Sequence, residues 1–389
     1  MRIKFLTHKN TVCRDAINRV STFFILFFST LTLNAQTTFL KNSENFSVCS
    51  ESYDYKTNTI SFKPYKDSLN TCALWFRFGM TGYRKDTVLT VKSVFDESSY
   101  NPSFLVFSYD NKEFFPMRNR YKNKHLEAAL KPEKDTVFFA TGYPYSYENL
   151  KKFLDENTPH KNLVKTENLD TASEFYIPLL TITSKKDSPK KKLVWIICRQ
   201  HAFESVANFV MEGMLKYLLS EDCSKKLLKR YIFKIVPMTD VENVVSGLSG
   251  RMSKPRDYNR DWDSPIRDRI KILENKIAET AKEYQYYMFF DVHGTFPCGI
   301  IGSGDFSFFD LKGNMQKSQD LRDYFHKISV KYFRPIPDNQ QSYGGMTADW
   351  WNYLNFKELK FSTTVEIDWI ENYETYYKIG EEMIKALEK

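Results

Sequence analysis

Four apolar segments that alternate with helical patterns constrain the second half of this chain most strongly. The segments are 192–198 (KLVWIIC), 231–238 (YIFKIVPM), 286–294 (YYMFFDVHG) and 360–369 (KFSTTVEIDW). A strand carries such a run when both of its faces are buried, as in a parallel sheet covered by helices. Residues 205–219, 264–284 and 373–387 have the helical spacing that this cover requires. The pattern predicts an α/β domain with a mixed sheet flanked by helices on both faces.

Residues 38 to 145 have a different rhythm. Five segments alternate β-branched or aromatic residues with polar ones, between breaks of Asn, Asp, Gly and Pro: 59–65, 72–80, 87–95, 103–109 and 136–143. This pattern predicts a small antiparallel β-sandwich. A helix is expected over 147–156, and we set the domains at 36–150 and 151–389. Ser264 and Pro265 are expected to start the helix 264–284, as N-cap and first-turn residue.

Residues 1–35 have the composition of an export signal. Basic side chains precede the apolar run 20–33, among them Lys4, Lys9, Arg14 and Arg19. A basic start, a short apolar stretch and a small residue, Ala35, predict a signal peptide and an exported protein, periplasmic or secreted. The run is short for a bilayer span, so no stable membrane span is expected after processing. An uncleaved anchor stays open, because Leu33 stands where a small residue is preferred.

The net charge and the cysteine content limit which partners and which covalent cross-links this chain is expected to have. Five basic residues and one acidic residue leave with 1–35, which lowers the formal net charge from +8 to +4. The lysine runs near 185–192 fall in a predicted linker, so nucleic acid is not an expected partner. Cys49 and Cys72 could form a disulfide in an oxidising compartment. They could equally remain free thiols.

Histidine and carboxylate side chains follow the ends of two apolar strands. His201 and Glu204 come directly after the segment 192–198, and His293 lies at the end of 286–294. Open α/β sheets place ligands at the carboxyl ends of their strands. Two imidazoles and a carboxylate, with one position left for water, are the ligand set of a hydrolytic zinc site. The alternative is a pair of ordinary turns with polar residues on them.

Two further positions carry chemistry. Asn259 and Arg260, in RDYNRDW, offer an amide and a planar guanidinium that together can hold a carboxylate; a charged loop is the alternative. Glu366 lies inside the apolar segment 360–369, where a glutamate is seldom buried without a function. In a desolvated cleft it would suit a general base. Otherwise it faces solvent at the sheet edge.

The order and spacing of these motifs resemble the zinc carboxypeptidases of the carboxypeptidase A-like family. The resemblance is closest to the cytosolic-carboxypeptidase branch and its bacterial relatives, and it covers roughly residues 70 to 375. The matching segments are 137–154 (VFFATGYPYSYENLKKFL), 199–205 (RQHAFES), 257–262 (DYNRDW), 291–294 (DVHG) and 364–367 (TVEI). The first looks like the end of that branch's accessory β-sandwich. Ala202 departs from the family's proline after the first histidine.

The resemblance implies one zinc ion per chain, with three ligands: His201, Glu204 and His293. Glu366 would be the general base that activates the zinc-bound water. Asn259 and Arg260 would grip the free C-terminal carboxylate of a peptide substrate. The remaining roles fall to Arg251 at the oxyanion, with Arg256 as its competitor, to Asp257 as the partner of His201, and to Tyr343 as the family's mobile capping tyrosine.

Position 349 departs from the glutamate-trimming relatives, which tend to have Thr-Ala-Arg where this chain has Thr347-Ala348-Asp349. An Asp349 that lines the pocket would favour a cationic side chain; an Asp349 at the surface would have no such role. The predicted function is an exported zinc metallocarboxypeptidase that removes C-terminal residues from peptides. The alternatives are a cell-wall (muropeptide) carboxypeptidase or amidase with the same zinc site, and a non-catalytic binding relative.

Overall fold

The computed structural model describes residues 37–41, 43–95, 104–158, 160–184, 189–223, 225–294, 306–309, 327–328, 331, 346–369 and 372–388. The predicted signal peptide and Tyr343 lie outside these residues. Residues 36–389 form one compact unit. Within the described part of this unit, the strands form one nine-stranded and one seven-stranded sheet.

The nine-stranded sheet holds the strands of the N-terminal region in the order β1-β4-β9-β6-β7-β8-β5-β3-β2. The strands are β1 (Thr38–Leu40), β2 (Cys49–Asp54), β3 (Thr59–Lys63), β4 (Arg77–Thr81), β5 (Leu89–Val94), β6 (Phe104–Ser108), β7 (Phe115–Lys122), β8 (His125–Leu130) and β9 (Thr136–Ala140). Neighbouring strands are antiparallel, with one correction to the sequence prediction: β3 and β5 run parallel. Phe62 packs edge-on against Phe76 and Phe78 in the core, with centroid distances of 4.7 and 4.8 Å.

The seven-stranded sheet has the order β10-β11-β13-β12-β14-β16-β15. Its strands are β10 (Leu163–Asn168), β11 (Pro178–Ile182), β12 (Lys192–Cys198), β13 (Tyr231–Val236), β14 (Gln285–Gly294), β15 (Phe306–Phe309) and β16 (Phe361–Ile367). The four strands predicted from the apolar segments are its parallel centre: β13, β12, β14 and β16. Antiparallel strands flank this centre on both sides, so the sheet is mixed as predicted.

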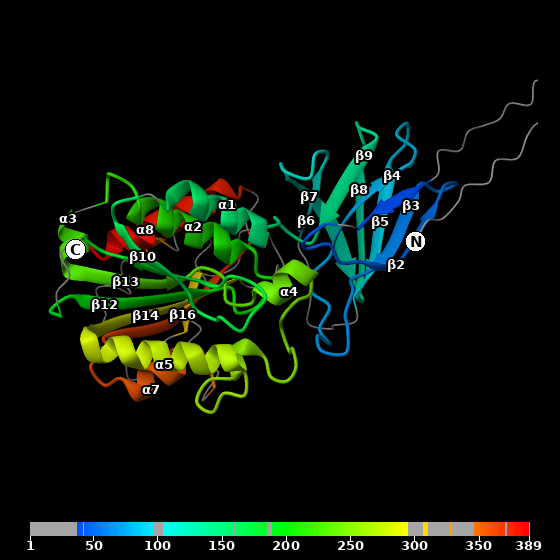
Figure 1. Ribbon diagram of the computed structural model, residues 1–389. Coiled ribbons are helices and arrows are strands. Elements are labelled where there is room, and N and C mark those ends of the chain that lie inside the picture. The colour runs from blue at the N-terminus through cyan, green and yellow to red at the C-terminus, as the bar shows by residue number, and fades with distance from the viewer. Residues whose placement is uncertain are drawn as a thin grey trace, which may run out of the picture. The chain divides into compact units, whose positions relative to one another are not determined.

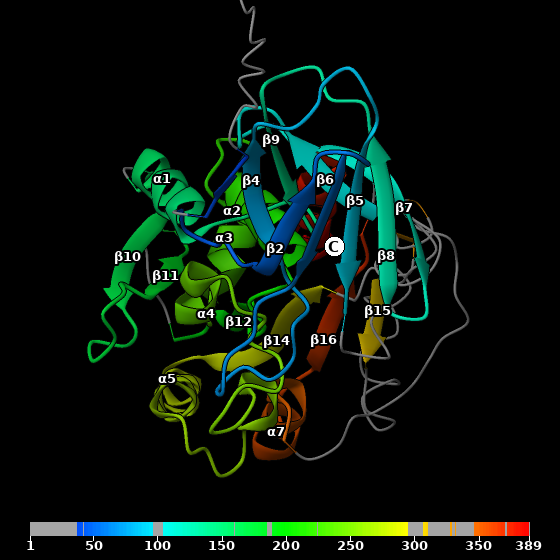
Figure 2. The same ribbon diagram turned by 90° about the vertical axis from the view of Figure 1, so that its right-hand side faces the viewer.

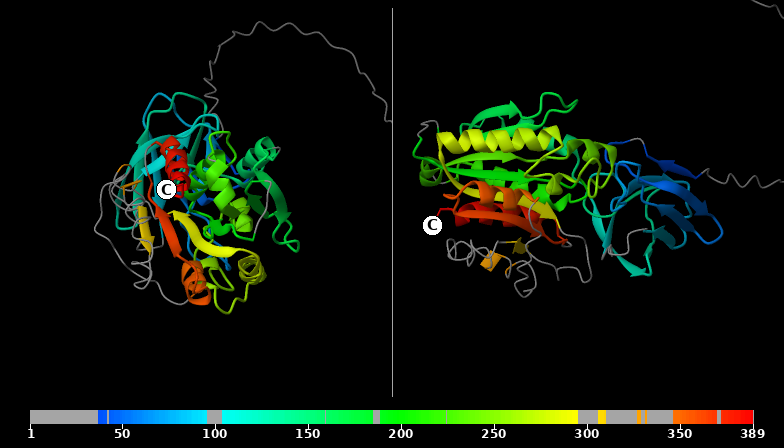
Figure 3. Two further views of the ribbon diagram at one scale, coloured as in Figure 1. Left: turned by 90° about the vertical axis from the view of Figure 1, so that its left-hand side faces the viewer. Right: turned by 90° about the horizontal axis from the view of Figure 1, so that it is seen from below.

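Helices cover both faces of this sheet, as the apolar runs predicted (Figure 1). They are α1 (Tyr147–Asn157), α2 (Val206–Leu218), α3 (Lys225–Arg230), α4 (Val241–Ser246), the 3-10 helix η1 (Tyr258–Arg260), α5 (Asp268–Glu283), α7 (Ala348–Asn355) and α8 (Glu374–Ala386). Helices α2 and α8 lie side by side on one face, and α5 and α7 lie on the other (Figures 2 and 3). No helix within the described ranges is both long and apolar enough to cross a membrane.

The predicted start of the helix after residue 264 was wrong. Helix α5 begins at Asp268, and Ser264 and Pro265 lie in the loop before it. The carboxylate of Asp261 accepts the N–H groups of Ile266 and Arg267 at 3.1 and 2.7 Å. These bonds hold the chain in a loop conformation ahead of the helix.

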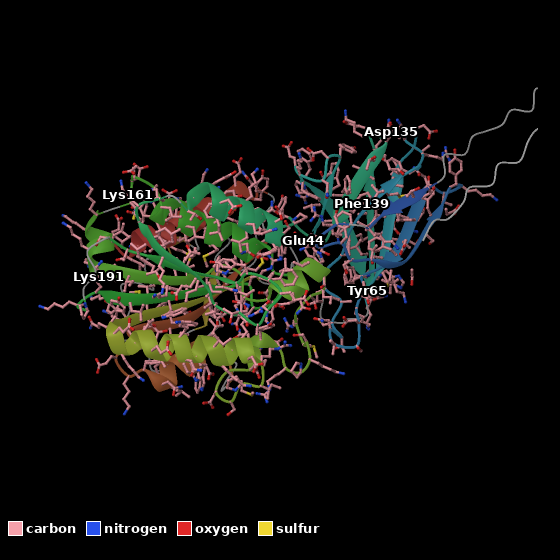
Figure 4. The ribbon with its side chains drawn as sticks, viewed as in Figure 1. Glu44, Tyr65, Asp135, Phe139, Lys161 and Lys191 are labelled. Atoms are coloured by element: carbon pink, nitrogen blue, oxygen red, sulfur yellow. The ribbon has the colours of Figure 1, made fainter. Side chains whose placement is uncertain are left out.

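The N-terminal region contacts the region of the seven-stranded sheet through backbone and side-chain bonds. Glu44, labelled in Figure 4, accepts the N–H groups of Tyr147 and Glu148 at the start of α1. The indole of Trp75 donates to the carbonyl of Asn45 at 3.0 Å, and the N–H of Asn45 donates to the carbonyl of Val245. The structure has free thiols at Cys49, Cys72, Cys198 and Cys223. Cys49 and Cys72 therefore do not form the disulfide that the sequence left open.

Candidate active site

His201 and Glu204 lie in the turn that connects β12 to α2. Arg199 opens this turn with a positive φ of 62°. Its buried guanidinium donates to the carbonyl of Ala202 at 2.7 Å and to Oδ1 of Asn208 at 2.6 Å. The arginine of the RQHAFES segment thus ties the turn to the first turns of α2, and fixes the direction in which the two predicted ligands point.

The structure brings the three predicted metal ligands together. Oε1 of Glu204 lies 2.8 Å from Nδ1 of His201, and Oε2 lies 2.8 Å from Nδ1 of His293. One ligand atom from each side chain falls within 4.8 Å of the others, and all three side chains are buried. Among the described residues, this is the group of His, Cys, Asp and Glu side chains that could hold a metal ion. A set of two nitrogens and a carboxylate suits Zn²⁺.

Each histidine is held from its other ring nitrogen by an aspartate. Nε2 of His201 lies 2.9 Å from Oδ1 of Asp257, as predicted, and Nε2 of His293 lies 2.9 Å from Oδ2 of Asp291. Such outer partners orient metal-binding histidines and fix their tautomer. Sequence reasoning missed Asp291. The sequence did indicate it, since Asp291 stands two residues before His293, and alternate residues of a strand lie on the same face.

The electrostatics of the cluster favour a cation. Burial opposes charge on the imidazole of His201, but the carboxylates of Asp257 and Glu204 outweigh it and raise its pKa to about 9. The pKa of His293 is raised for the same reason by Asp291 and Glu204. Three carboxylates around two imidazoles, two of them buried and that of Asp257 half-buried, create a negative potential that also attracts a divalent cation. The residues present therefore fit the metal that their donor atoms suggest.

Glu366 lies beside His293 on the neighbouring strand, because the parallel register of β14 and β16 pairs these two residues. Glu366 is half-buried, and its strand is not an outer strand of the sheet, because β15 pairs with β16 on the other side. Burial of most of the carboxyl raises its pKa to about 7, and the nearby imidazole of His293 limits the rise. A pKa near neutrality suits a group that accepts and returns a proton.

The segment 251–260 contains the other predicted residues, and Asn259 of this segment contacts a ligand histidine. The N–H of Met252, which follows Arg251, donates to Oδ2 of Asp257 at 2.9 Å. The amide of Asn259 is buried, with Nδ2 3.2 Å from Nε2 of His293 and Oδ1 accepting the N–H of Ala348 at 3.0 Å. Arg260 donates to the carbonyl of Asn259 at 2.7 Å.

Arg256, the competitor of Arg251 for the oxyanion role, is engaged elsewhere. Its Nη1 lies 3.2 Å from Oδ1 of Asp261 and donates to the carbonyl of Ser264 at 3.1 Å. Both partners belong to the loop that precedes α5.

Asp349 is buried in the first turn of α7, with 5% of its surface exposed. An Asp349 that points to solvent is therefore excluded. Its carbonyl accepts the hydroxyl of Ser362 on β16 at 2.7 Å, and its Oδ1 has no hydrogen-bond partner in the described part of the chain. Burial raises its pKa to about 6. The N–H of Ala348, the residue before it, donates to Asn259, so the backbone at Asp349 lies near the predicted carboxylate-binding amide.

The chain is similar to known carboxypeptidases in sequence and in fold. Residues 150–285 match the zinc carboxypeptidase family. Cytosolic carboxypeptidase 3 of Bos taurus is 31% identical over 172 residues, which are 41% of this chain and 17% of that protein. Cytosolic carboxypeptidase 1 of Homo sapiens is 34% identical over 153 residues, 35% of this chain and 12% of that protein. The chain thus spans less than a fifth of the length of these relatives.

Two solved structures share the fold over most of the chain. The metallo-carboxypeptidase from Burkholderia cenocepacia is 22% identical, with a TM-score of 0.78 over 90% of this chain and 97% of that one. The metallo-carboxypeptidase from Pseudomonas aeruginosa, in complex with (2-guanidinoethylmercapto)succinic acid, is 18% identical, with a TM-score of 0.74 over 90% and 98%. The family match includes two of the three clustered ligands, and the fold agrees along nearly the whole chain. Residues 150–285 are thus similar to the zinc carboxypeptidase family, and the chain shares its fold with these solved metallo-carboxypeptidases.

Proposed function

We propose that this chain is a zinc metallocarboxypeptidase that removes C-terminal residues from peptides. The observation that carries the proposal is the buried His201-Glu204-His293 cluster, with Glu366 in register beside it. A metal site alone would serve a binding protein equally well. A glutamate at this position, with a pKa raised toward neutrality, has a use in hydrolysis and none in simple binding.

The bound zinc ion would supply Lewis-acid polarisation of the scissile carbonyl and lower the pKa of a water molecule. Glu366 then takes the proton of the attacking water on its carboxylate and passes it to the nitrogen of the leaving amine. Arg251, next to the Met252–Asp257 bond, supplies a positive charge for the developing oxyanion. Asp257 and Asp291 keep both imidazoles oriented throughout.

Asn259 and Arg260 restrict cleavage to a chain end. An amide donor and a planar guanidinium can hold both oxygens of a terminal carboxylate, and an internal peptide bond offers no such group. The bond from Ala348 to Asn259 fixes the amide with its nitrogen toward the metal ligands. A substrate without a free C-terminus would leave these groups without a partner.

We further infer that Asp349 gives the enzyme a preference for a basic C-terminal residue. A buried carboxylate with one oxygen unpartnered among the described residues is costly, and a cationic substrate group would relieve this cost. The same carboxylate would accept the free amine of a diamino acid in a muropeptide stem. This keeps cell-wall carboxypeptidase or amidase activity as the second candidate. Export, on which that candidate depends, remains a prediction from residues 1–35.

Metal content and turnover test the proposal together. The purified protein should contain about one zinc ion per chain, and His293→Ala should lose both zinc and activity. Glu366→Gln should retain zinc and lose at least about 100-fold in kcat. His125→Ala and Glu358→Gln change exposed residues of the same types and should alter neither. Full zinc content with no turnover of any peptide by the unmodified protein would point to a binding relative instead.

A panel of peptides ending in Lys, Arg, Glu or Phe, together with a muropeptide stem, tests the inference on Asp349. Mass spectrometry should show preferential release of Lys or Arg, and Asp349→Asn should remove the preference. (2-Guanidinoethylmercapto)succinic acid, which combines a guanidino group with carboxylates, should inhibit the unmodified protein more strongly than Asp349→Asn. Preferential release of Glu would contradict the role of Asp349 and leave the carboxypeptidase proposal intact.

A further inference from the structure

A second cavity lies against the α2 and α8 side of the sheet and includes none of the proposed catalytic residues. Its volume is about 370 Å³, within the range of small-molecule sites. Side chains from α1, α2, α8 and the segment 143–145 line it, with Lys112 and Phe114 completing one side. The carbonyl of Tyr143 accepts the hydroxyl of Ser205 at 2.6 Å, so the wall of the cavity is tied to the residue that follows Glu204.

Aromatic rings form much of the lining of this cavity. Tyr143, Tyr145 and Phe209 are buried, and Tyr373 and Tyr377 are half-buried. Ring centroids of Tyr143 and Tyr373 are 5.3 Å apart, and Phe209 lies 5.8 Å from both Tyr373 and Tyr377. Tyrosine-rich surfaces offer flat apolar faces to a ligand together with hydroxyl groups for hydrogen bonds.

Four of the five charged side chains that line the cavity are paired with one another. Glu212 lies 2.8 Å from Nζ of Lys216, which also lies 4.0 Å above the ring of Tyr377. Lys152 lies 4.0 Å from Glu156. An anionic ligand would have to displace Glu212 from Lys216, and a cationic ligand would have to displace Lys216 from Glu212. Lys112 adds one positive charge at the exposed rim, so the lining favours a ligand without net charge.

Two amides at the cavity retain hydrogen-bonding capacity. Asn149 uses its Oδ1 to cap α1 through Ser146, and Asn157 uses its Nδ2 to donate to the carbonyl of Phe153 at 2.8 Å. Within the described residues, the amide nitrogen of Asn149 and the amide oxygen of Asn157 are not used by these bonds. A purely apolar ligand would leave such groups without partners as it displaced water.

We propose that this cavity binds a neutral saccharide. A pyranose ring has an apolar face that stacks on aromatic rings and a rim of hydroxyl groups that both donate and accept hydrogen bonds. The cavity combines these two requirements: aromatic faces from three elements, and a rim of amides, tyrosine hydroxyls and paired charges. The site is separate from the metal centre, so saccharide binding does not depend on carboxypeptidase activity.

Ligand-observed saturation-transfer NMR on the full zinc-loaded protein tests this site. The probes are the neutral disaccharides cellobiose and N,N′-diacetylchitobiose, with benzoate and benzamidine as an anion and a cation of flat shape. We expect at least one disaccharide to bind, and both charged probes to bind more weakly. Tyr373→Ala should weaken disaccharide binding about tenfold, because a stacked ring is lost. Tyr65→Ala, an exposed tyrosine outside the cavity (Figure 4), is the matched control.

Lys216→Met adds a test that misfolding cannot imitate. The substitution leaves the carboxylate of Glu212 without its ion pair, so benzamidine binding should increase while disaccharide binding falls. The proposal is overturned if neither disaccharide binds the unmodified protein, if Tyr373→Ala binds as well as Tyr65→Ala, or if a charged probe binds the unmodified protein most tightly. An unchanged benzamidine affinity in Lys216→Met would contradict the role of the paired charges.

Discussion

Replacing Asp291 should weaken zinc binding, although this residue contacts no metal in our proposal. Its side chain is fully buried, and its Oδ2 lies 2.9 Å from Nε2 of His293 and accepts a bond from Nε2 of Gln200 at 2.6 Å. The indole of Trp262 donates to the same glutamine at 3.0 Å. Asp291 therefore orients one ligand histidine. It is itself held in place by a buried chain of hydrogen bonds through Gln200 and Trp262.

The size of the effect depends on what the substitution leaves behind. Loss of such an outer partner costs about 10- to 100-fold in metal affinity, which equals about 1.4 to 2.7 kcal/mol. Asp291→Asn keeps an oxygen that can accept from both His293 and Gln200, and loses only the negative charge. We expect it near the lower bound. Asp291→Ala removes the acceptor as well and should lie near the upper bound.

Competition with a chromophoric chelator measures the zinc affinity directly, and thermal unfolding of the metal-free protein reports separately on folding. Asp268→Asn is the matched control, since Asp268 is 85% exposed and pairs with Lys271 on the surface. The order expected is Asp268→Asn unchanged, then Asp291→Asn, then Asp291→Ala with the weakest binding. Equal zinc affinity in all three variants and the unmodified protein would refute the outer-partner role.

Three further changes test the packing, the electrostatics and the substrate loop. Gly380→Ala should lower the free energy of unfolding by about 1–3 kcal/mol, because its Cβ would lie 2.0 Å from the carbonyl oxygen of Val210; an unchanged denaturant midpoint would mean that α8 can move off α2. Burial raises the pKa of Asp240 to about 6. The folded state thus favours the protonated acid, and stability falls as pH rises from about 4 to about 6; Asp240→Asn should remove this loss, up to about 3 kcal/mol, in urea unfolding at pH 5 and pH 8. Arg267 lies 4.4 Å above the ring of Tyr258 and donates to two groups of segment 253–254, so Arg267→Ala should raise KM at constant zinc content, with partial rescue by Lys.

The sequence predicted the parallel centre of the seven-stranded sheet because burial on both faces leaves an unmistakable apolar run. It did not predict β7, whose residues 115–122 are largely polar and exposed. Such an exposed strand forms because the strands on both of its sides offer hydrogen-bond partners, and this information lies in β6 and β8 rather than in the strand itself. Strand β10 was missed for the same reason, since it pairs with β11 along a half-exposed edge.

The start of α5 shows a different limit. Ser264 and Pro265 carry the usual signals of a helix start, but Asp261 accepts the N–H groups of residues 266 and 267 and delays the helix. Local propensity was outweighed by two specific hydrogen bonds to the side chain of Asp261. Propensity is a weak prior that such contacts override.

In the site, as in the fold, the residues on buried strands were easier to predict than those in loops. The ligands were predictable because they lie at or directly after the carboxyl ends of apolar strands. In a parallel sheet these ends lie at the same edge, so the side chains that follow them come together. Strand β14 then supplies three things at once: the ligand His293, its partner Asp291 two residues earlier, and the register that sets Glu366 beside it. Rigid, buried strands hold the chemistry of the proposed reaction, since a small misplacement of a reacting group is costly. The proposed contacts to substrate come instead from segment 251–260 and the start of α7, whose positions are set by loops. Selectivity can therefore change by substitution at a position such as Asp349 without any change to the metal ligands, which is the separation that the peptide panel would measure.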